Sequence, residues 1–154
     1  MPVSLYINSP GGSIPATLAI YDAMQFIRPR VQTTCVGQAA ATSALLLAGG
    51  APGSRSILPH GRVVIHAPAA EGRGTVPDLI LEAEEVERVR TMQEEILAWH
   101  TGRTAAQVLE DTKGDLILAP GRGGGLRRRG RGARHPGPVI RQPSRQALWG
   151  STRG

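Results

Sequence analysis

The groups of this chain best suited to chemistry are backbone N–H groups at two turns built from small residues. The first turn lies in VGQAAATSALLL (36–47), which predicts a strand over 32–36 ended by Gly37 and an apolar helix over 39–47. A strand that turns sharply into a helix leaves unpaired N–H groups at the turn, where they suit a developing negative charge. Taken alone, the stretch fits an ordinary strand-to-helix turn of an α/β core better.

The second turn is NSPGGS (8–13), where Gly11 and Gly12 permit positive φ and open N–H groups to a ligand. A plain turn is again the simpler interpretation. Two side chains with catalytic potential follow. His66 ends a predicted strand over 62–66, and Asp115 lies just beyond a predicted short helix.

The remaining elements alternate as in an α/β protein. A strand is expected over 3–7 and a helix over 15–27, while Thr75 and Asp78 match a capping box that starts a long helix reaching His100 and ended by Gly102. A short helix is predicted over 104–111. One apolar face of the long helix is expected from Leu79, Ala83, Val86, Val89, Ile96 and Leu97.

Length and composition indicate one soluble domain. The 154 residues suffice for a single core, and one cysteine, Cys35, excludes a disulfide framework and favours a reducing cytoplasm. No apolar stretch reaches the roughly 20 residues of a membrane span, and no signal peptide is visible, so we expect no membrane partner.

The charge of the chain is divided sharply. Residues 1–118 hold all 12 acids and 9 basic residues (net −3), whereas residues 119–154 hold 9 arginines and no acid (net +9). Gly, Pro and Arg make up 22 of those last 36 residues, a composition that predicts disorder. A basic arm is one alternative, but without an aromatic pattern or a known module we expect no nucleic-acid partner. A shifted reading frame of GC-rich coding sequence is another, which the abrupt boundary favours.

Several segments together resemble one family, the proteolytic subunit of the ATP-dependent Clp protease. In order they are LYINSPGGS (5–13), AIYDAMQFI (19–27), GQAA (37–40), LPHGRVVIHAP (58–68), the Glu-rich helix, HTG (100–102) and the two aspartates of DTKGD (111–115). The resemblance covers roughly residues 3–118. Its variable part, ATSALLLAGG (41–50), is similar to the divergent paralogues of actinobacteria.

The resemblance implies a serine peptidase of crotonase-like α/β fold, here partial, assembled as two stacked seven-membered rings. It implies His66 as general base, Asp115 as the acid that orients it, and the N–H groups of Gly12 and Thr42 as the oxyanion hole. Gly11 belongs to the loop that aligns the substrate strand. Residues 75–100 correspond to the handle helix through which the rings meet.

The nucleophile departs from the family pattern, because the position after GQAA is Ala41 instead of serine. A methyl group has neither an oxygen to attack a carbonyl nor a proton for His66 to accept. Ser43 lies about 200° and Thr42 about 100° further around a helix, so neither is expected to replace the serine. We therefore expect a site with base, orienter and oxyanion donors that lacks its nucleophile.

The implied partners are an AAA+ unfoldase of the Clp type, paralogous peptidase subunits and unfolded polypeptides. No cofactor is expected, since ATP is used by the unfoldase. The family pattern also extends before residue 3 and past residue 118, so we expect both flanks of the domain to be missing. Three functions stay open: a non-catalytic subunit of a mixed ring, a protein that only docks through its long helix, or a non-functional remnant.

Overall fold

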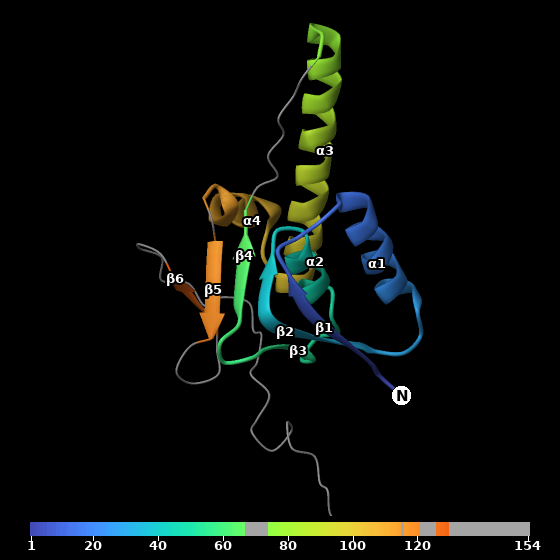
Figure 1. The fold of residues 1–154 in the computed structure, drawn as a ribbon, viewed down its shortest axis with the longest axis vertical. Coiled ribbons are helices and arrows are strands. Elements are labelled where there is room, and N and C mark those ends of the chain that lie inside the picture. Colours follow the sequence, from blue (N-terminus) through green and yellow to red (C-terminus); the bar gives the residue numbers. More distant parts are fainter. Residues whose placement is uncertain (67–73, 115, 121–125, 130–154) are drawn as a thin grey trace, which may run out of the picture.

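One six-stranded mixed sheet carries the fold of the chain. The computed structural model describes residues 1–66, 74–114, 116–120 and 126–129. The strands are β1 (Val3–Ser9), β2 (Val31–Ala40), β3 (Arg55–Ile57), β4 (Arg62–Ile65), β5 (Leu116–Pro120) and β6 (Leu126–Arg129). Their order is β1-β2-β4-β5-β6, with β3 also paired to β2 (Figure 1).

Strand β2 is the centre of the sheet, and its three partners β1, β3 and β4 all run parallel to it. Its first half pairs with β3 and its second half with β4, through Gln38 opposite Arg62 and Ala40 opposite Val64. Strands β5 and β6 then continue the sheet in antiparallel fashion. The carboxyl ends of β1, β2 and β4 therefore meet at one edge of the sheet.

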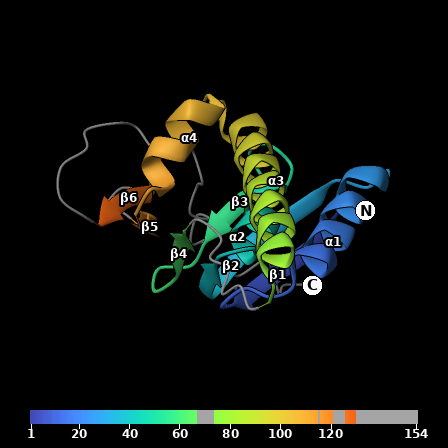
Figure 2. The same ribbon diagram turned by 90° about the horizontal axis from the view of Figure 1, so that it is seen from above.

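Helix α2 (Ser43–Ala48) lies between the sheet and the other helices. It contacts β1, β2 and β4 on one side and α1 (Ile14–Phe26) and α3 (Val76–Thr101) on the other (Figures 1 and 2). Helix α4 (Ala105–Thr112) packs against α3. Helix α2, which follows the sharp turn at the end of β2, is thus enclosed from all sides. This explains why five of its six residues are buried.

Two apolar clusters meet on opposite sides of α2. The sheet-side cluster consists of Ile7, Cys35, Ala39, Ala44, Leu47, Ile57 and Val63. The helix-side cluster consists of Leu45, Ala48, Leu97 and Val108. Each buried aliphatic side chain of this size contributes on the order of 1.5–3 kcal/mol, so α2 links both halves of the core.

Helix α3 begins and ends as the sequence predicts. Thr75 donates its N–H to Asp78 Oδ2 at 3.0 Å in a capping box, and Gly102 ends the helix in the left-handed region at φ 69°. The expected apolar face is only partly buried: Val89 and Leu97 are buried, whereas Leu79 is 39 % exposed. The reason is visible in Figure 1, where the N-terminal half of α3 projects beyond the sheet.

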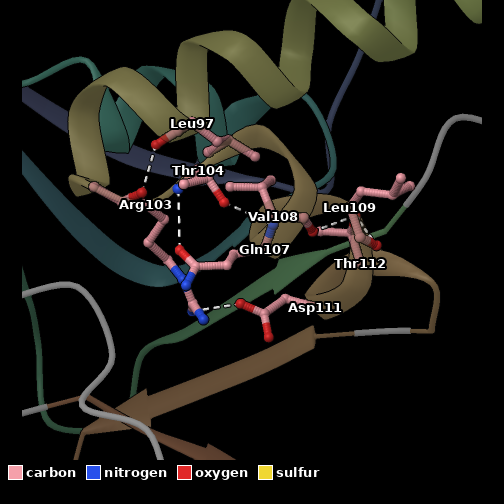
Figure 3. Close-up of polar contacts among 9 residues, drawn as sticks. Leu97, Arg103, Thr104, Gln107, Val108, Leu109, Asp111 and Thr112 are labelled. Atoms are coloured by element: carbon pink, nitrogen blue, oxygen red, sulfur yellow. Dashed lines mark hydrogen bonds and ion pairs between the residues drawn. The ribbon is translucent and has the colours of Figure 1, made fainter.

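Side-chain and backbone hydrogen bonds fix α4 and the connection before it (Figure 3). Thr104 and Gln107 form a reciprocal capping box, with Gln107 N donating to Thr104 Oγ1 at 3.2 Å and Thr104 N to Gln107 Oε1 at 3.0 Å. Arg103 and Asp111 form an ion pair, both largely buried. These contacts fix the direction in which the chain leaves α4 toward β5.

A polar joint connects α1, α3 and β3. The Tyr21 hydroxyl and His100 Nε2 lie 2.7 Å apart, and Arg55 Nη1 donates to the His100 carbonyl at 2.7 Å and to the Ala48 carbonyl at 3.1 Å. Burial, and secondarily the charge of Arg55, lowers the pKa of His100, while burial raises the pKa of Tyr21. The joint therefore favours a neutral imidazole.

The structure corrects the predicted boundary between β2 and α2. Gly37 does not end the strand: β2 runs on to Ala40, and the helix starts at Ser43 instead of Ala39. Gly37 instead has φ 85°, opposite the register shift between Ile7 and Ser9 in β1. Pairing of the two alanines with β4 outweighs their helix propensity.

The predicted tail also contains structure. Residues 119–120 end β5, and Leu126–Arg129 forms β6, which pairs with β5 through Ala119 opposite Arg127. The other residues of the expected tail, 121–125 and 130–154, lie outside the described residues, so their disorder stays a prediction. In the part of the chain that the structure describes, no helix has the length and apolar character to cross a membrane.

Candidate active site

The elbow between β2 and α2 is the most strained point of the described backbone. Ala41 has φ 51°, the only positive φ of a non-glycine residue within the described ranges. The left-handed conformation costs an L-residue about 1–2 kcal/mol. The Ala41 N–H donates to the Val64 carbonyl at 2.9 Å and its carbonyl accepts from Ala44 N at 3.1 Å, so both strand β4 and helix α2 hold the turn.

This strained elbow is the geometry that presents a nucleophile at the end of a strand. Ala41 is partly exposed, while its neighbours Ala40 and Thr42 are buried. The structure therefore places the position expected for the nucleophile at a sharp strand-to-helix turn. The side chain there is a methyl group, which cannot attack a carbonyl.

Gly11 lies directly against the elbow. A Cβ at this residue would lie 2.9 Å from the Ala41 Cβ and 3.2 Å from the Ala40 carbonyl oxygen, and its φ is 113°. Only glycine satisfies both conditions. The loop SPGG (9–12) thus meets the elbow that follows GQAA (37–40), although the two are about thirty residues apart in sequence. The resemblance implies this contact.

Gly12 and Thr42, the two expected oxyanion donors, are in contact through the Thr42 side chain. Gly12 N donates to Thr42 Oγ1 at 3.0 Å, and the same hydroxyl donates to the Gly12 carbonyl at 3.3 Å. The sequence indicated the backbone N–H of Thr42 but not this use of its hydroxyl. The sequence signal that could have indicated this bond was a hydroxyl-bearing residue directly after the elbow, together with a double glycine in the loop expected to face it.

The Ser43 hydroxyl is occupied as well. It donates toward the Ala40 carbonyl at 2.7 Å and the Ser9 carbonyl at 3.1 Å, and the residue is 4 % exposed. The Ser43 hydroxyl proton is thus engaged by backbone carbonyls. The expectation that neither Thr42 nor Ser43 replaces the nucleophile stays a prediction.

His66 lies one residue beyond the end of β4 and is exposed. The parallel pairing of Ala40 with Val64 brings the end of β4 beside the elbow, so His66 follows at the same edge of the sheet as Ala41. Within the described part of the chain, no hydrogen bond holds the His66 ring. The structure thus places His66 at the edge of the sheet that carries the elbow, and its role as the base stays a prediction.

Asp115 lies outside the described residues. The residue after it, Leu116, pairs with Ile65, the residue before His66. The role of Asp115 as the orienting acid thus stays a prediction. The pairing of Leu116 with Ile65 is the observation that bears on it.

A cleft of about 320 Å³ runs along the end of β1, the start of α1 and the elbow. The residues lining it include Asn8, Ser9, Gly11, Gly12, Thr42 and Ser43, together with apolar residues such as Ile20 and Leu46. Ala41 and His66 do not line it. The cleft therefore contains the expected oxyanion donors and the strand-aligning loop, while the base position lies outside it.

The site gives no indication of a bound metal. Among the described residues, no three or more His, Cys, Asp or Glu side chains lie close enough to hold an ion. The chemistry that the arrangement supports is stabilisation of negative charge by backbone N–H groups at a strained elbow.

Comparison with known proteins agrees with this geometry. A family model described as Clp protease matches residues 1–122. The ATP-dependent Clp protease proteolytic subunit 1 of Corynebacterium glutamicum is 57% identical over 117 residues, which is 75% of this chain and 56% of that protein. Subunit 1 of Nocardia farcinica is 56% identical over 116 residues, covering 75% of this chain and 59% of that protein.

A subunit with another number gives a similar result. Subunit 3 of Frankia casuarinae is 50% identical over 117 residues, 76% of this chain and 55% of that protein. The chain thus spans little more than half the length of these curated relatives. The family model covers most of the chain, and it includes the elbow, both glycines of the SPGG loop and His66. This chain belongs to the Clp protease family.

Proposed function

We propose that the chain is a proteolytic subunit of the ATP-dependent Clp protease by descent that does not itself hydrolyse peptides. The observation that carries this proposal is Ala41 at the strained elbow, held by its N–H to Val64 and placed against Gly11. The strand-to-helix turn and the close glycine suit a nucleophile, and the position holds a methyl group.

In the proposed site His66 is the general base and Asp115 orients it. The N–H groups of Gly12 and Thr42 serve the oxyanion, and Gly11 with its loop aligns an unfolded polypeptide. Without an oxygen at residue 41, no acyl-enzyme forms and His66 has no proton to accept. Loss of the serine alone costs roughly a million-fold in turnover in a well-studied serine protease.

The proposed role is that of a non-catalytic member of a mixed ring in the cytoplasm, beside an active paralogous subunit and served by an AAA+ unfoldase of the Clp type. The exposed N-terminal half of α3 supports a docking role, since Val76, Ile80 and Leu81 are 70 %, 55 % and 65 % exposed. Apolar side chains exposed together mark a contact surface.

The test combines mass and reactivity. The purified chain is measured in solution alone and after mixing with an active Clp subunit, and both samples are treated with a fluorophosphonate probe. We expect co-assembly, with label only on the active subunit. Label on this chain refutes the lack of catalysis, while absence of any mixed species refutes the ring role and leaves docking through α3 to another protein, or a non-functional remnant.

A further inference from the structure

Gly12 and Thr42 are joined by two hydrogen bonds, and both of them use the Thr42 hydroxyl. The Thr42 hydroxyl accepts from Gly12 N at 3.0 Å and donates to the Gly12 carbonyl at 3.3 Å. Thr42 is 8 % exposed, whereas Gly12 is exposed to solvent. The Gly12 N–H thus lies in an accessible loop, yet it points at a buried hydroxyl of the same chain.

Catalytic N–H groups stabilise an oxyanion only if they are free to meet the oxygen on which charge develops. A hydroxyl oxygen is a hydrogen-bond acceptor of the same kind as that oxygen, although it carries no charge. At 3.0 Å from Gly12 N, Thr42 Oγ1 stands at the ordinary distance of an N–H···O bond. It therefore takes the place in which a substrate oxygen would be bound.

We propose that the Thr42 hydroxyl is a built-in occupant of the oxyanion hole, which keeps the Gly12 N–H closed to a substrate carbonyl. The proposal rests on the proposed function for the oxyanion role of Gly12. The site then differs from an active peptidase at two adjacent positions: residue 41 lacks the nucleophile, and residue 42 occupies one of the two donors.

The surroundings keep this contact in place. Gly11 lies against the Ala41 Cβ and the Ala40 carbonyl, so the loop cannot shift toward the elbow. Ser43 Oγ bonds the Ser9 carbonyl on the other side of the loop. The Thr42–Gly12 contact therefore lies between a close backbone approach at Gly11 and a hydrogen bond at Ser9.

The occupant slows reaction without forbidding it, because a developing oxyanion is a stronger acceptor than a neutral hydroxyl. The reactivity test uses the full chain with a nucleophile introduced by Ala41→Ser. Ala41→Ser, Ala41→Ser/Thr42→Val and Ala41→Ser/Thr42→Ser are compared for their rate of labelling by a fluorophosphonate. Valine keeps the shape of threonine and removes the hydroxyl, and serine keeps the hydroxyl.

We expect the valine double variant to label at least about ten-fold faster than Ala41→Ser, a gain below the roughly hundred- to thousand-fold effect of one oxyanion donor. The serine double variant keeps the hydroxyl and should therefore label more slowly than the valine double variant. Equal rates for the valine and serine double variants overturn the proposal. If residue 42 acted only through its shape, the valine double variant would resemble Ala41→Ser more closely than the serine double variant does, because valine has nearly the shape of threonine.

A second measurement needs no nucleophile. Hydrogen exchange of the Gly12 amide is followed by NMR in the unmodified chain and in Thr42→Val and Thr42→Ser. We expect at least about ten-fold faster exchange in the valine variant and protection in the other two, since the amide is exposed once the hydroxyl is gone.

Labelling rates and amide exchange together distinguish a failure of the proposed function from a failure of the proposed occupant. If no variant labels while the Gly12 amide behaves as expected, the hydroxyl does close the N–H, and the roles proposed for residue 41, His66 and Asp115 fail. If the Gly12 amide of the unmodified chain exchanges as fast as that of an unfolded peptide, the occupant itself is refuted, whatever the labelling shows.

Discussion

The Ala41 N–H donates to the Val64 carbonyl at 2.9 Å, and this bond ties the elbow to β4, the strand that ends before His66. The elbow therefore has a fixed place relative to the end of β4, from which His66 follows. Helix α2 encloses the elbow from behind through two apolar clusters. Under the proposed function, residue 41 in this turn is the position that lacks the nucleophile oxygen.

The first prediction concerns that oxygen. The unmodified chain should not react with a fluorophosphonate or hydrolyse casein, and Ala41→Ser should acquire label, since serine is tolerated wherever alanine adopts this turn. Turnover should differ by up to roughly a million-fold. The label is measured by gel fluorescence.

The matched control for this gain is Ala41→Ser/His66→Gln, which removes the base and leaves the elbow intact. It should label far more slowly than Ala41→Ser. Equal labelling of the two variants contradicts the role of His66, and labelling of the unmodified chain contradicts the assignment of Ala41.

The second prediction concerns the close approach of the SPGG loop. Gly11→Ala places a Cβ 2.9 Å from the Ala41 Cβ at φ 113°, so it should lower the free energy of unfolding by about 1–3 kcal/mol. Gly12→Ala is the control: its Cβ meets nothing within 4 Å, and its φ lies outside the strained region. Urea unfolding of both variants measures the difference, and equal stabilities would falsify the close contact.

The third prediction concerns pH. Burial and the Arg55 charge lower the pKa of His100 below its ordinary 6.5, so the unfolded chain binds this proton at a higher pH than the folded chain. The stabilising contribution is complete above pH 6.5 and is lost as the pH falls from there toward the lowered folded pKa. The chain should be less stable at acidic than at neutral pH.

Replacing the imidazole isolates this effect from other titrations. His100→Gln should flatten the acid loss of stability relative to the unmodified chain, while His60→Gln, at an exposed turn, should not. Unfolding midpoints in urea at several pH values provide the measurement. An unchanged pH dependence in His100→Gln would show that the joint with Tyr21 tolerates the proton.

Local signals explain which elements the sequence predicts well. Helix α3 is delimited by a capping box at Thr75 and by Gly102, and both act within a few residues of the helix ends. The elbow was misjudged because Ala39 and Ala40 favour a helix in isolation but pair with β4 in the sheet. Strand β3 was missed because three residues carry too little periodicity, and pairing with β2 defines it.

In the candidate site as well, some features are visible in the sequence and others depend on the folded arrangement. The types and order of Gly11, Gly12, Ala41 and His66 are visible in the sequence, and the sheet brings the glycines to the elbow. The Thr42 hydroxyl bond to Gly12 joins residues thirty apart and depends on the rotamer of one side chain. No periodicity or propensity carries such information.

The fourth prediction concerns strand β6. Its pairing with β5 should protect the backbone beside Arg127, Arg128 and Arg129, whereas the Gly, Pro and Arg composition of 130–154 predicts ready cleavage. Limited trypsin digestion followed by mass spectrometry should therefore cut at Arg131 and Arg134 before it cuts within 127–129. Early cleavage within 127–129 would contradict a stable β6.

The last prediction concerns assembly through α3. Its N-terminal half exposes Val76, Ile80 and Leu81, and in a lone chain this apolar surface favours association without a defined partner. Strand β1 at the edge of the described sheet adds an unpaired edge with the same tendency. We therefore expect the isolated chain to be heterogeneous in light scattering, and mixing with an active Clp subunit to convert it to a defined species.

A charge on the apolar surface tests whether α3 makes that contact. Ile80→Glu/Leu81→Glu should reduce incorporation into the mixed species at least about ten-fold, because two buried carboxylates without partners oppose an apolar contact. Thr91→Glu adds a charge at an exposed polar position of the same helix and should leave incorporation unchanged. Equal incorporation of both variants excludes the N-terminal half of α3 as the contact, and a single sharp species of two-ring mass from the isolated chain contradicts the need for a partner subunit.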